Sequence, residues 1–201
     1  ALPISLPDAR ALDEQLERMV RGWSPAVEAA LTEEVGAGAA ARLVLAFGSA
    51  FPLSYRNRYP AEEAGRDMVR LRALDNPEQR GARLYQQAGD GERQLRLKTY
   101  RLGGLIPLSD AVPVLEAFGF RVLEENPTPL DGGTLGYIHD YLLELDETID
   151  IAAVMARAEV AEDAIAAALE GRAENDSFNQ LIIAVGLDPQ AVVLFRAWFR
   201  Y

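Results

Sequence analysis

The hydrophobic residues of this chain change their spacing twice, and this change constrains the fold more than any other feature. Apolar residues of segment 1–74 recur every three or four positions, as on one face of a helix, and this spacing returns after Asp150. Between these regions, segment 94–100 alternates strictly, so Leu95 and Leu97 share one face of a strand. A chain with helices at both ends and strands in the middle is expected to adopt an α+β fold.

The first part of the chain is predicted to be helical. Cap and turn residues divide it into four segments, each with apolar residues at helical spacing. We predict these helices at residues 8–21, at 24 to about 36, at 39–47, and from 60 to about 74.

Four strands and one helix are predicted in the middle of the chain. The strands are expected at residues 83–87, 94–100, 121–125 and 135–145, and the helix at residues 109–119. Asp90–Gly91 marks a hairpin turn, Gly103–Gly104 ends the second strand, and residues 126–133 are expected to form a loop. The order strand–strand–helix–strand–strand predicts an antiparallel four-stranded sheet near the ferredoxin-like group, with helices on one side.

Helices return in the last part of the chain. Residues 151–173 are predicted as one long helix, and Asn175–Asp176 begins another that ends at Gly186. Asp188 as N-cap and Pro189 at the first helical position predict a final helix. Because no Gly, Asn or Pro ends that helix, we expect the chain to be a piece of a longer protein.

The composition excludes several classes of function. With 20 Lys and Arg against 31 Asp and Glu, the formal net charge is −11, which argues against a nucleic-acid-binding surface. The absence of Cys excludes disulfides, thiolate zinc sites and cysteine nucleophiles, and favours a reducing compartment. No apolar run approaches the ~20 residues that span a bilayer, so we expect a cytoplasmic protein without membrane contact.

Two glycine-containing segments are candidates for ligand binding. Residues 36–41 faintly imitate a dinucleotide-binding loop, but the preceding residues read as a helix rather than the required strand, so we interpret them as a helix–helix turn. Gly103 and Gly104 lie between a strand and a capped helix, where backbone N–H groups can approach a small ligand. We predict Gly103, Gly104 and the neighbouring Arg101 as effector-binding residues; the alternative is a loop that needs glycine only for its backbone conformation.

The single histidine and the single lysine are the remaining candidates for proton chemistry. His139 precedes Asp140, but adjacent strand residues point to opposite faces, so Asp140 cannot orient the imidazole. We therefore interpret His139 as a partly buried sheet histidine between Tyr137 and Tyr141. Lys98 alternates with Arg96 on the face predicted to be solvated, which disfavours an activated amine.

Two acidic groups raise the alternative of a metal site. They are Glu124–Glu125 and the run Asp146, Glu147 and Asp150. Neither group has a histidine or carboxylate at ligand spacing, so we interpret them as strand-end and helix-start acids. We predict no metal site and no catalytic residue.

Several segments occur in a fixed order between about residue 50 and residue 201. They are residues 51–56, 62–64, 70–74, 95–101, 107–111, 115–122, 137–140, 173–181, 184–187 and 196–201. Together these segments resemble the large bacterial NAD-specific glutamate dehydrogenases. That family converts glutamate and NAD to 2-oxoglutarate, ammonia and NADH.

The resemblance implies a segment of the N-terminal region that precedes the catalytic domain, where ACT-like modules are linked to regulation and assembly. On this basis we predict a helical connector at residues 1–58, an ACT-like domain at 59–150 and a helical segment at 151–201. The family's lysine–aspartate active site and nucleotide-binding domain match no position here. The resemblance therefore implies no cofactor in this segment, and NAD in the catalytic domain of the parent enzyme. The strand order departs from the usual βαββαβ start of ACT modules.

Three functions follow from this reading. The first is a non-catalytic regulatory or assembly segment of a homo-oligomeric glutamate dehydrogenase, whose partners are other domains of the same polypeptide. The second is an ACT-like module that senses an amino-acid effector. The third is a purely structural interaction domain, in which Phe195, Trp198 and Phe199 dock on the rest of the protein.

Overall fold

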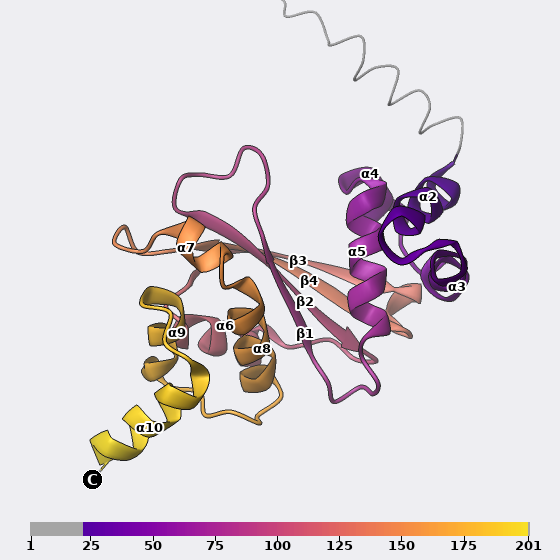
Figure 1. Cartoon of the computed structure of the whole chain (residues 1–201). Helices are drawn as coiled ribbons and strands as arrows, with labels where there is room; N and C mark the ends of the chain where they lie inside the picture. Colours follow the sequence, from indigo (N-terminus) through magenta and orange to yellow (C-terminus); the bar gives the residue numbers. More distant parts are fainter. Residues whose placement is uncertain (1–21, 201) are drawn as a thin grey trace, which may run out of the picture. The chain divides into compact units, whose positions relative to one another are not determined.

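The computed structural model describes residues 22–200 (Figure 1). Its contacts form two compact units, the first ending at Val69 and the second beginning at Arg70, and each is described on its own. The helix predicted at residues 8–21 lies outside the described residues. The domain boundaries at residues 58/59 and 150/151 stay predictions.

The described part of the first unit is helical. It contains α2 (Trp23–Val35), α3 (Ala37–Phe47), α4 (Leu53–Arg58) and most of α5 (Ala61–Arg72). Gly36 joins α2 and α3 with a φ of +80°, which a glycine adopts without strain, and the two helices pack against each other. A helix and not a strand therefore precedes residues 36–41, as predicted, but the turn is Gly36 alone, and residues 37–41 already belong to α3.

An aromatic cluster packs inside this unit. The rings of Phe51 and Tyr55 lie 4.7 Å apart between centroids, and those of Tyr55 and Tyr59 lie 4.6 Å apart. The Tyr55 hydroxyl donates to the buried carboxylate of Asp67 on α5. This hydrogen bond ties α4 to α5, and α4 itself was not predicted from the sequence.

The second unit is built on a four-stranded antiparallel sheet. Its strands are β1 (Gly81–Tyr85), β2 (Gln94–Leu102), β3 (Arg121–Leu130) and β4 (Gly136–Glu144), in the order β1-β2-β4-β3. Helix α6 (Leu108–Ala117) connects β2 to β3. The predicted α+β fold, with the order ββαββ and an antiparallel sheet, is confirmed.

One face of this sheet carries the core. Leu95 and Leu97 are fully buried, together with Leu143 of β4, and they share a cluster with Leu115 of α6 and Ile165 of α8 (Ala158–Leu169). The alternation read from the sequence therefore identified the face of β2 that packs on the helices correctly.

Strand β3 is longer than predicted. It continues through residues 126–130, which were expected to be a loop because of Pro127 and Pro129. Strand β3 lies at the edge of the sheet and pairs only with β4. An edge strand tolerates proline because one side of its backbone needs no ladder partner.

The long helix predicted at residues 151–173 is two helices. Helix α7 (Ile151–Met155) is separated from α8 at Arg157, whose φ of −124° and ψ of 24° interrupt the helix. The Arg157 guanidinium donates from Nε to the Ala153 carbonyl at 3.1 Å. The change of direction lets Ile151 and Ile165 enter the same core.

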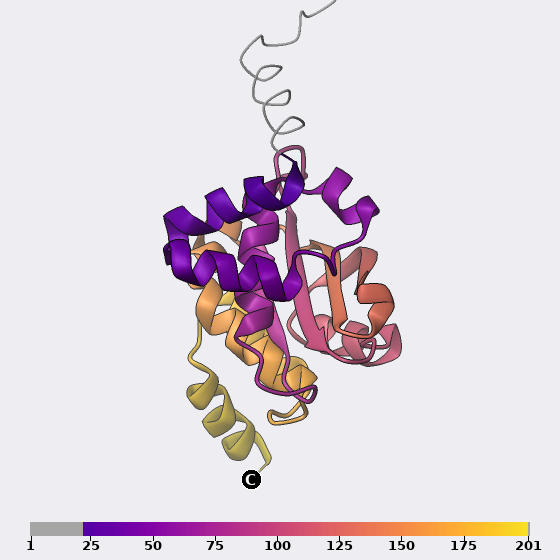
Figure 2. The ribbon, with the colours of Figure 1, turned by 90° about the vertical axis from the view of Figure 1, so that its right-hand side faces the viewer.

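The last elements are short and capped. Asp176 caps a 3₁₀ turn (Ser177–Asn179) that continues into α9 (Gln180–Ala184). Asp188 caps α10 (Pro189–Arg200) through a 2.8 Å bond from Gln190 N, as the sequence predicted. Within the second unit, α10 points away from the sheet in both views (Figures 1 and 2). None of the helices in residues 22–200 is long and apolar enough to cross a bilayer.

Candidate functional site

Two of the predicted effector residues, Gly103 and Gly104, lie in the loop between β2 and α6, and the third, Arg101, lies near the end of β2. Gly103 has a φ of +75°, and its N–H donates to the Leu135 carbonyl at 3.0 Å. Arg101 donates from Nη1 to the Leu105 carbonyl at 2.7 Å, which holds the loop from its other side. A side-chain carbon placed on Gly104 would meet no atom within 4 Å. The loop thus needs one glycine for its conformation and is open at the second, and effector binding there stays a prediction.

His139 lies directly under this loop. Its side chain is fully buried and stacks between Tyr137 and Tyr141, with ring centroids 6.0 and 6.1 Å away. Nδ1 lies 2.7 Å from Glu125 Oε1, and Nε2 accepts from the Ile106 N–H at 3.3 Å. Because a backbone N–H can only donate, Nε2 is unprotonated and the neutral ring carries its proton on Nδ1, toward Glu125.

The sequence reasoning about His139 was correct on Asp140 and incomplete on the rest. Asp140 faces the opposite side of the sheet, where its Oδ2 accepts from the Tyr85 hydroxyl at 2.7 Å. Glu125, the real partner, was missed because it comes from β3, and the expected burial was only partial. Glu125 could have been found only from the pairing of β3 with β4, and the spacing of residues in the sequence does not reveal that pairing.

The environment of this cluster shifts two pKa values. Burial lowers the pKa of His139 below its ordinary value of 6.5, although the adjacent Glu125 carboxylate acts in the opposite direction. Burial also raises the pKa of the Tyr141 hydroxyl. Both shifts favour the neutral forms, so the interior of the cluster holds an uncharged imidazole and an uncharged phenol.

The prediction that Lys98 lies on a solvated face of β2 is wrong. This residue is fully buried, with its ammonium 5.5 Å from the centre of the Tyr85 ring and with Asp140 as its cross-strand neighbour. A charge is tolerated in such a place when polar and aromatic groups surround it. The alternating pattern placed Lys98 correctly on the face opposite Leu95 and Leu97, but it did not predict that this face is buried.

The acidic residues between Asp146 and Asp150 have local structural roles. Glu125 instead lies inside β3 and contacts His139 of β4, so the strand-end interpretation of Glu124–Glu125 is wrong for Glu125. Asp150 accepts from Ala152 N at 2.9 Å and so caps α7, and Asp146 accepts from Thr148 N at 2.9 Å. The helix-start interpretation of Asp150 is confirmed. Over the described range, 22–200, no group of three or more metal-ligating side chains comes together.

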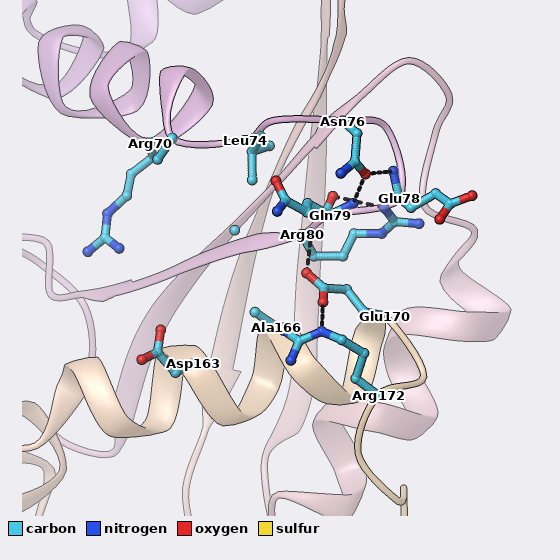
Figure 3. Close-up of a pocket in the computed structure, with 12 residues that line it drawn as sticks. Arg70, Leu74, Asn76, Glu78, Gln79, Arg80, Asp163, Ala166, Glu170 and Arg172 are labelled. Carbon is cyan, nitrogen blue, oxygen red and sulfur yellow. Dashed lines mark hydrogen bonds and ion pairs between the residues drawn. The ribbon is translucent and has the colours of Figure 1, made fainter.

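A pocket of about 710 Å³ lies beside β1, between the loop that precedes this strand and α8 (Figure 3). Glu170, which directly follows α8, accepts from the Arg80 backbone N–H at 2.7 Å and forms an ion pair with Arg172. Figure 3 shows Arg70 and Asp163 at the end of the pocket that is farther from Arg80 and Glu170. No sequence signal pointed to this pocket, because its walls are about 90 residues apart in the chain.

Just outside the pocket, Glu162 of α8 bridges two groups. Its Oε1 accepts from Leu84 N of β1 at 2.9 Å, and its Oε2 accepts from Arg70 Nη2 at 2.8 Å. The carboxylate is buried and both of its oxygens are bonded, so Glu162 has a structural role beside the pocket.

Three sequence-family models match this chain. The first is described as "Glutamate dehydrogenase, ACT3 domain" and matches residues 79–155, which contain the sheet and the glycine loop. The other two are described as "Glutamate dehydrogenase, helical motif 2", at residues 30–74, and "Glutamate dehydrogenase, helical motif 3", at residues 173–201.

Curated relatives agree with these matches. The chain is 32% identical over 196 residues to an NAD-specific glutamate dehydrogenase of Pseudomonas aeruginosa, and 33% identical over 195 residues to one of Halomonas elongata. Each alignment covers 96% of this chain but only 12% of the relative. An enzyme of the same name from Mycobacterium tuberculosis is 29% identical over all of this chain and 13% of its own length. The chain therefore belongs to the large NAD-specific glutamate dehydrogenases, as a segment that contains their ACT3 domain.

Proposed function

We propose that this segment is a non-catalytic regulatory and assembly part of an enzyme that oxidises glutamate with NAD. The observation that carries the proposal is the position of the single lysine and the single histidine. Lys98 is fully buried, and both ring nitrogens of His139 are engaged by Glu125 and Ile106. Neither side chain is available to a substrate, and the family models describe this part as an ACT domain with helical motifs.

The test is an activity assay on the purified chain. With saturating glutamate and NAD, we expect no NADH formation above the background without protein, while an intact relative assayed in parallel is active. Turnover by the chain alone at an enzyme-like rate, of the order of 1 s⁻¹ or faster, would overturn the proposal.

The exposed apolar side chains of helix α10 support the assembly role. Leu194, Trp198 and Phe199 are 70%, 78% and 78% exposed. Arg196 of the same helix is buried and donates to Asp176 and Asn179, which fixes the helix in place. A fixed helix that presents large apolar side chains to solvent is typical of a protein interface.

Binding to the remainder of the polypeptide tests this role. Immobilised chain is expected to retain the rest of a relative's polypeptide, and the pair Trp198→Asp and Phe199→Asp to lose it. Leu45→Asp is the matched control, because Leu45 is 86% exposed on α3. Equal retention by all variants would remove α10 from the assembly surface.

The sensing role belongs to the glycine loop, which Arg101 and Ile106 attach to the sheet. Calorimetric titration with the common amino acids tests it, with Arg101→Gln as the variant. A uniformly flat response from the native chain would count against this role.

A further inference from the structure

The pocket beside β1 has the dimensions of a small-molecule site. Its volume of about 710 Å³ falls within the range of roughly 300–1,000 Å³ that is usual for such sites. One wall is the loop before β1, the other is α8, and the side chains of Leu74 and Ala166 lie between them (Figure 3). All of its walls belong to the second unit.

The loop presents hydrogen-bond donors to this space. Asn76 Oδ1 accepts from the N–H groups of Glu78 and Gln79, at 2.9 and 3.2 Å, and Gln79 Oε1 accepts from Asp75 N at 2.6 Å. These bonds fix each amide with its oxygen on the backbone and its NH₂ group turned away from it. Within residues 22–200, neither NH₂ group has a hydrogen-bond partner.

Arg80 adds positive charge at the same end. Its Nη1 donates to the carbonyls of Pro77 and Gln79, at 2.8 and 2.9 Å, while Nε is buried without a partner in the described structure. Burial and the nearby Arg101 lower the pKa of this guanidinium, so its charge is incompletely compensated even with Glu170 and Glu78 close by. A negatively charged group in the pocket would stabilise it.

The other end of the pocket has a different character. Arg70 is paired with Glu162, and the carboxylate of Asp163 stands unpaired among the described residues. In Figure 3, Asp163 projects from α8 at a distance from Arg80 and the two amides. An anion is therefore favoured at the loop end, away from Asp163.

We propose that this pocket binds a small organic anion through a carboxylate or phosphate group, held by the amide NH₂ groups of Asn76 and Gln79 beside Arg80. Both groups present the same chemistry, which is a negatively charged oxygen that accepts hydrogen bonds. The site rests on the pocket alone, so it stands or falls separately from the role proposed above for the whole segment.

Calorimetric titration of the whole chain with succinate, and separately with inorganic phosphate, tests the site at constant ionic strength. We expect saturable binding of at least one anion, and the preferred one shows whether the group is a carboxylate or a phosphate. Gln79→Glu keeps the oxygen that accepts from Asp75 N but replaces the donor by a charge. The variant loses a hydrogen bond to the anion, and its carboxylate repels the anion. Together these effects are expected to weaken binding by at least about tenfold.

Gln94→Glu is the matched control. Gln94 also accepts a backbone N–H through its side-chain oxygen, from Gly91 at 2.7 Å, but lies outside the pocket. We expect it to leave the affinity within about twofold, which is the size of a distant charge effect in salt. Absence of saturable binding to the native chain, or equal affinity of the two variants, overturns the proposal. If Gln79→Glu lowers the thermal midpoint, Asn76→Asp provides the same test at the second amide.

Discussion

His139 is held in one protonation state by its neighbours. Its Nε2 must accept from Ile106 N, and its Nδ1 donates to Glu125. A second proton would place an N–H against the N–H of Ile106 and remove the contact that fixes the glycine loop. The charges that face the ring are the Glu125 carboxylate, which favours protonation, and Arg101, which opposes it together with burial.

This arrangement makes the stability of the fold dependent on pH. Because the pKa of His139 is lowered in the folded state, the unfolded chain takes up a proton first as the pH falls below about 6.5. The free energy of unfolding is therefore expected to decrease from pH 6.5 downward, until the folded pKa is reached, by up to about 1.4 kcal/mol per pH unit. Urea unfolding between about pH 8 and pH 5 measures this decrease.

His139→Gln is the comparison for that measurement, because glutamine fills similar space and does not titrate. It is expected to be less stable at neutral pH and to show a smaller decrease between pH 6.5 and pH 5 than the native chain. Carboxylates that lie away from His139 affect both proteins equally. Identical slopes for the two proteins would show that His139 is not the group responsible.

At the scale of elements, α8 protects the outer edge of β1. Strand β1 is the first strand in the order β1-β2-β4-β3, so one side of its backbone has no neighbouring strand. Glu162 accepts from Leu84 N and Glu170 accepts from Arg80 N. Glu162 thus satisfies an N–H group on the open edge of β1, and Glu170 satisfies the N–H group directly before the strand; both would otherwise be available to another chain.

Glu162 is expected to be the more important of the two for stability, because it is only 4% exposed. Glu162→Ala leaves the buried Leu84 N–H without a partner and Arg70 without its counter-charge, and is expected to lower the free energy of unfolding by about 2 kcal/mol. The matched control is Glu159→Ala, an exposed acid in the first turn of the same helix, with an expected loss of about 0.5 kcal/mol. Equal losses in urea unfolding would contradict the role of Glu162.

Local signals predicted most of the elements. Asp188 and Pro189 marked the start of α10, and Gly36 marked the end of α2. The alternation around Leu95 and Leu97 identified the face of β2 that packs on the helices. In each case the cause lies within a few residues of its effect, so sequence spacing contains the information.

Long-range causes explain what the sequence did not predict. Strand β3 passes through Pro127 because it lies at the edge of the sheet, and that position depends on the order of all four strands. The break before α8 contains no glycine or proline, and it accompanies the burial of Ile151 and Ile165 in one core. Lys98 is buried because of groups that other strands bring beside it.

At the scale of the whole molecule, the candidate sites also divide into one that local sequence signals predicted and others that depend on long-range contacts. The glycine loop was predicted because its residues are contiguous, whereas the Glu125–His139 pair and the pocket beside β1 each join separate elements. Only the strand pairing and the position of α8 bring those groups together.

The net charge of −11 is the other property of the whole molecule with a measurable consequence. Like charges repel in the compact state, and salt shortens the range of repulsion from about 10 Å at 0.1 M to about 3 Å at 1 M. Salt also weakens exposed ion pairs such as Arg121–Glu144, but each of these contributes only about 0–1 kcal/mol. The repulsion is expected to dominate, so the urea midpoint should rise when sodium chloride is added to a low-salt buffer. Glu33→Lys with Glu34→Lys, at two exposed positions of α2, lowers the net negative charge and should reduce this rise. A midpoint that falls steadily with salt would show instead that the ion pairs outweigh the repulsion.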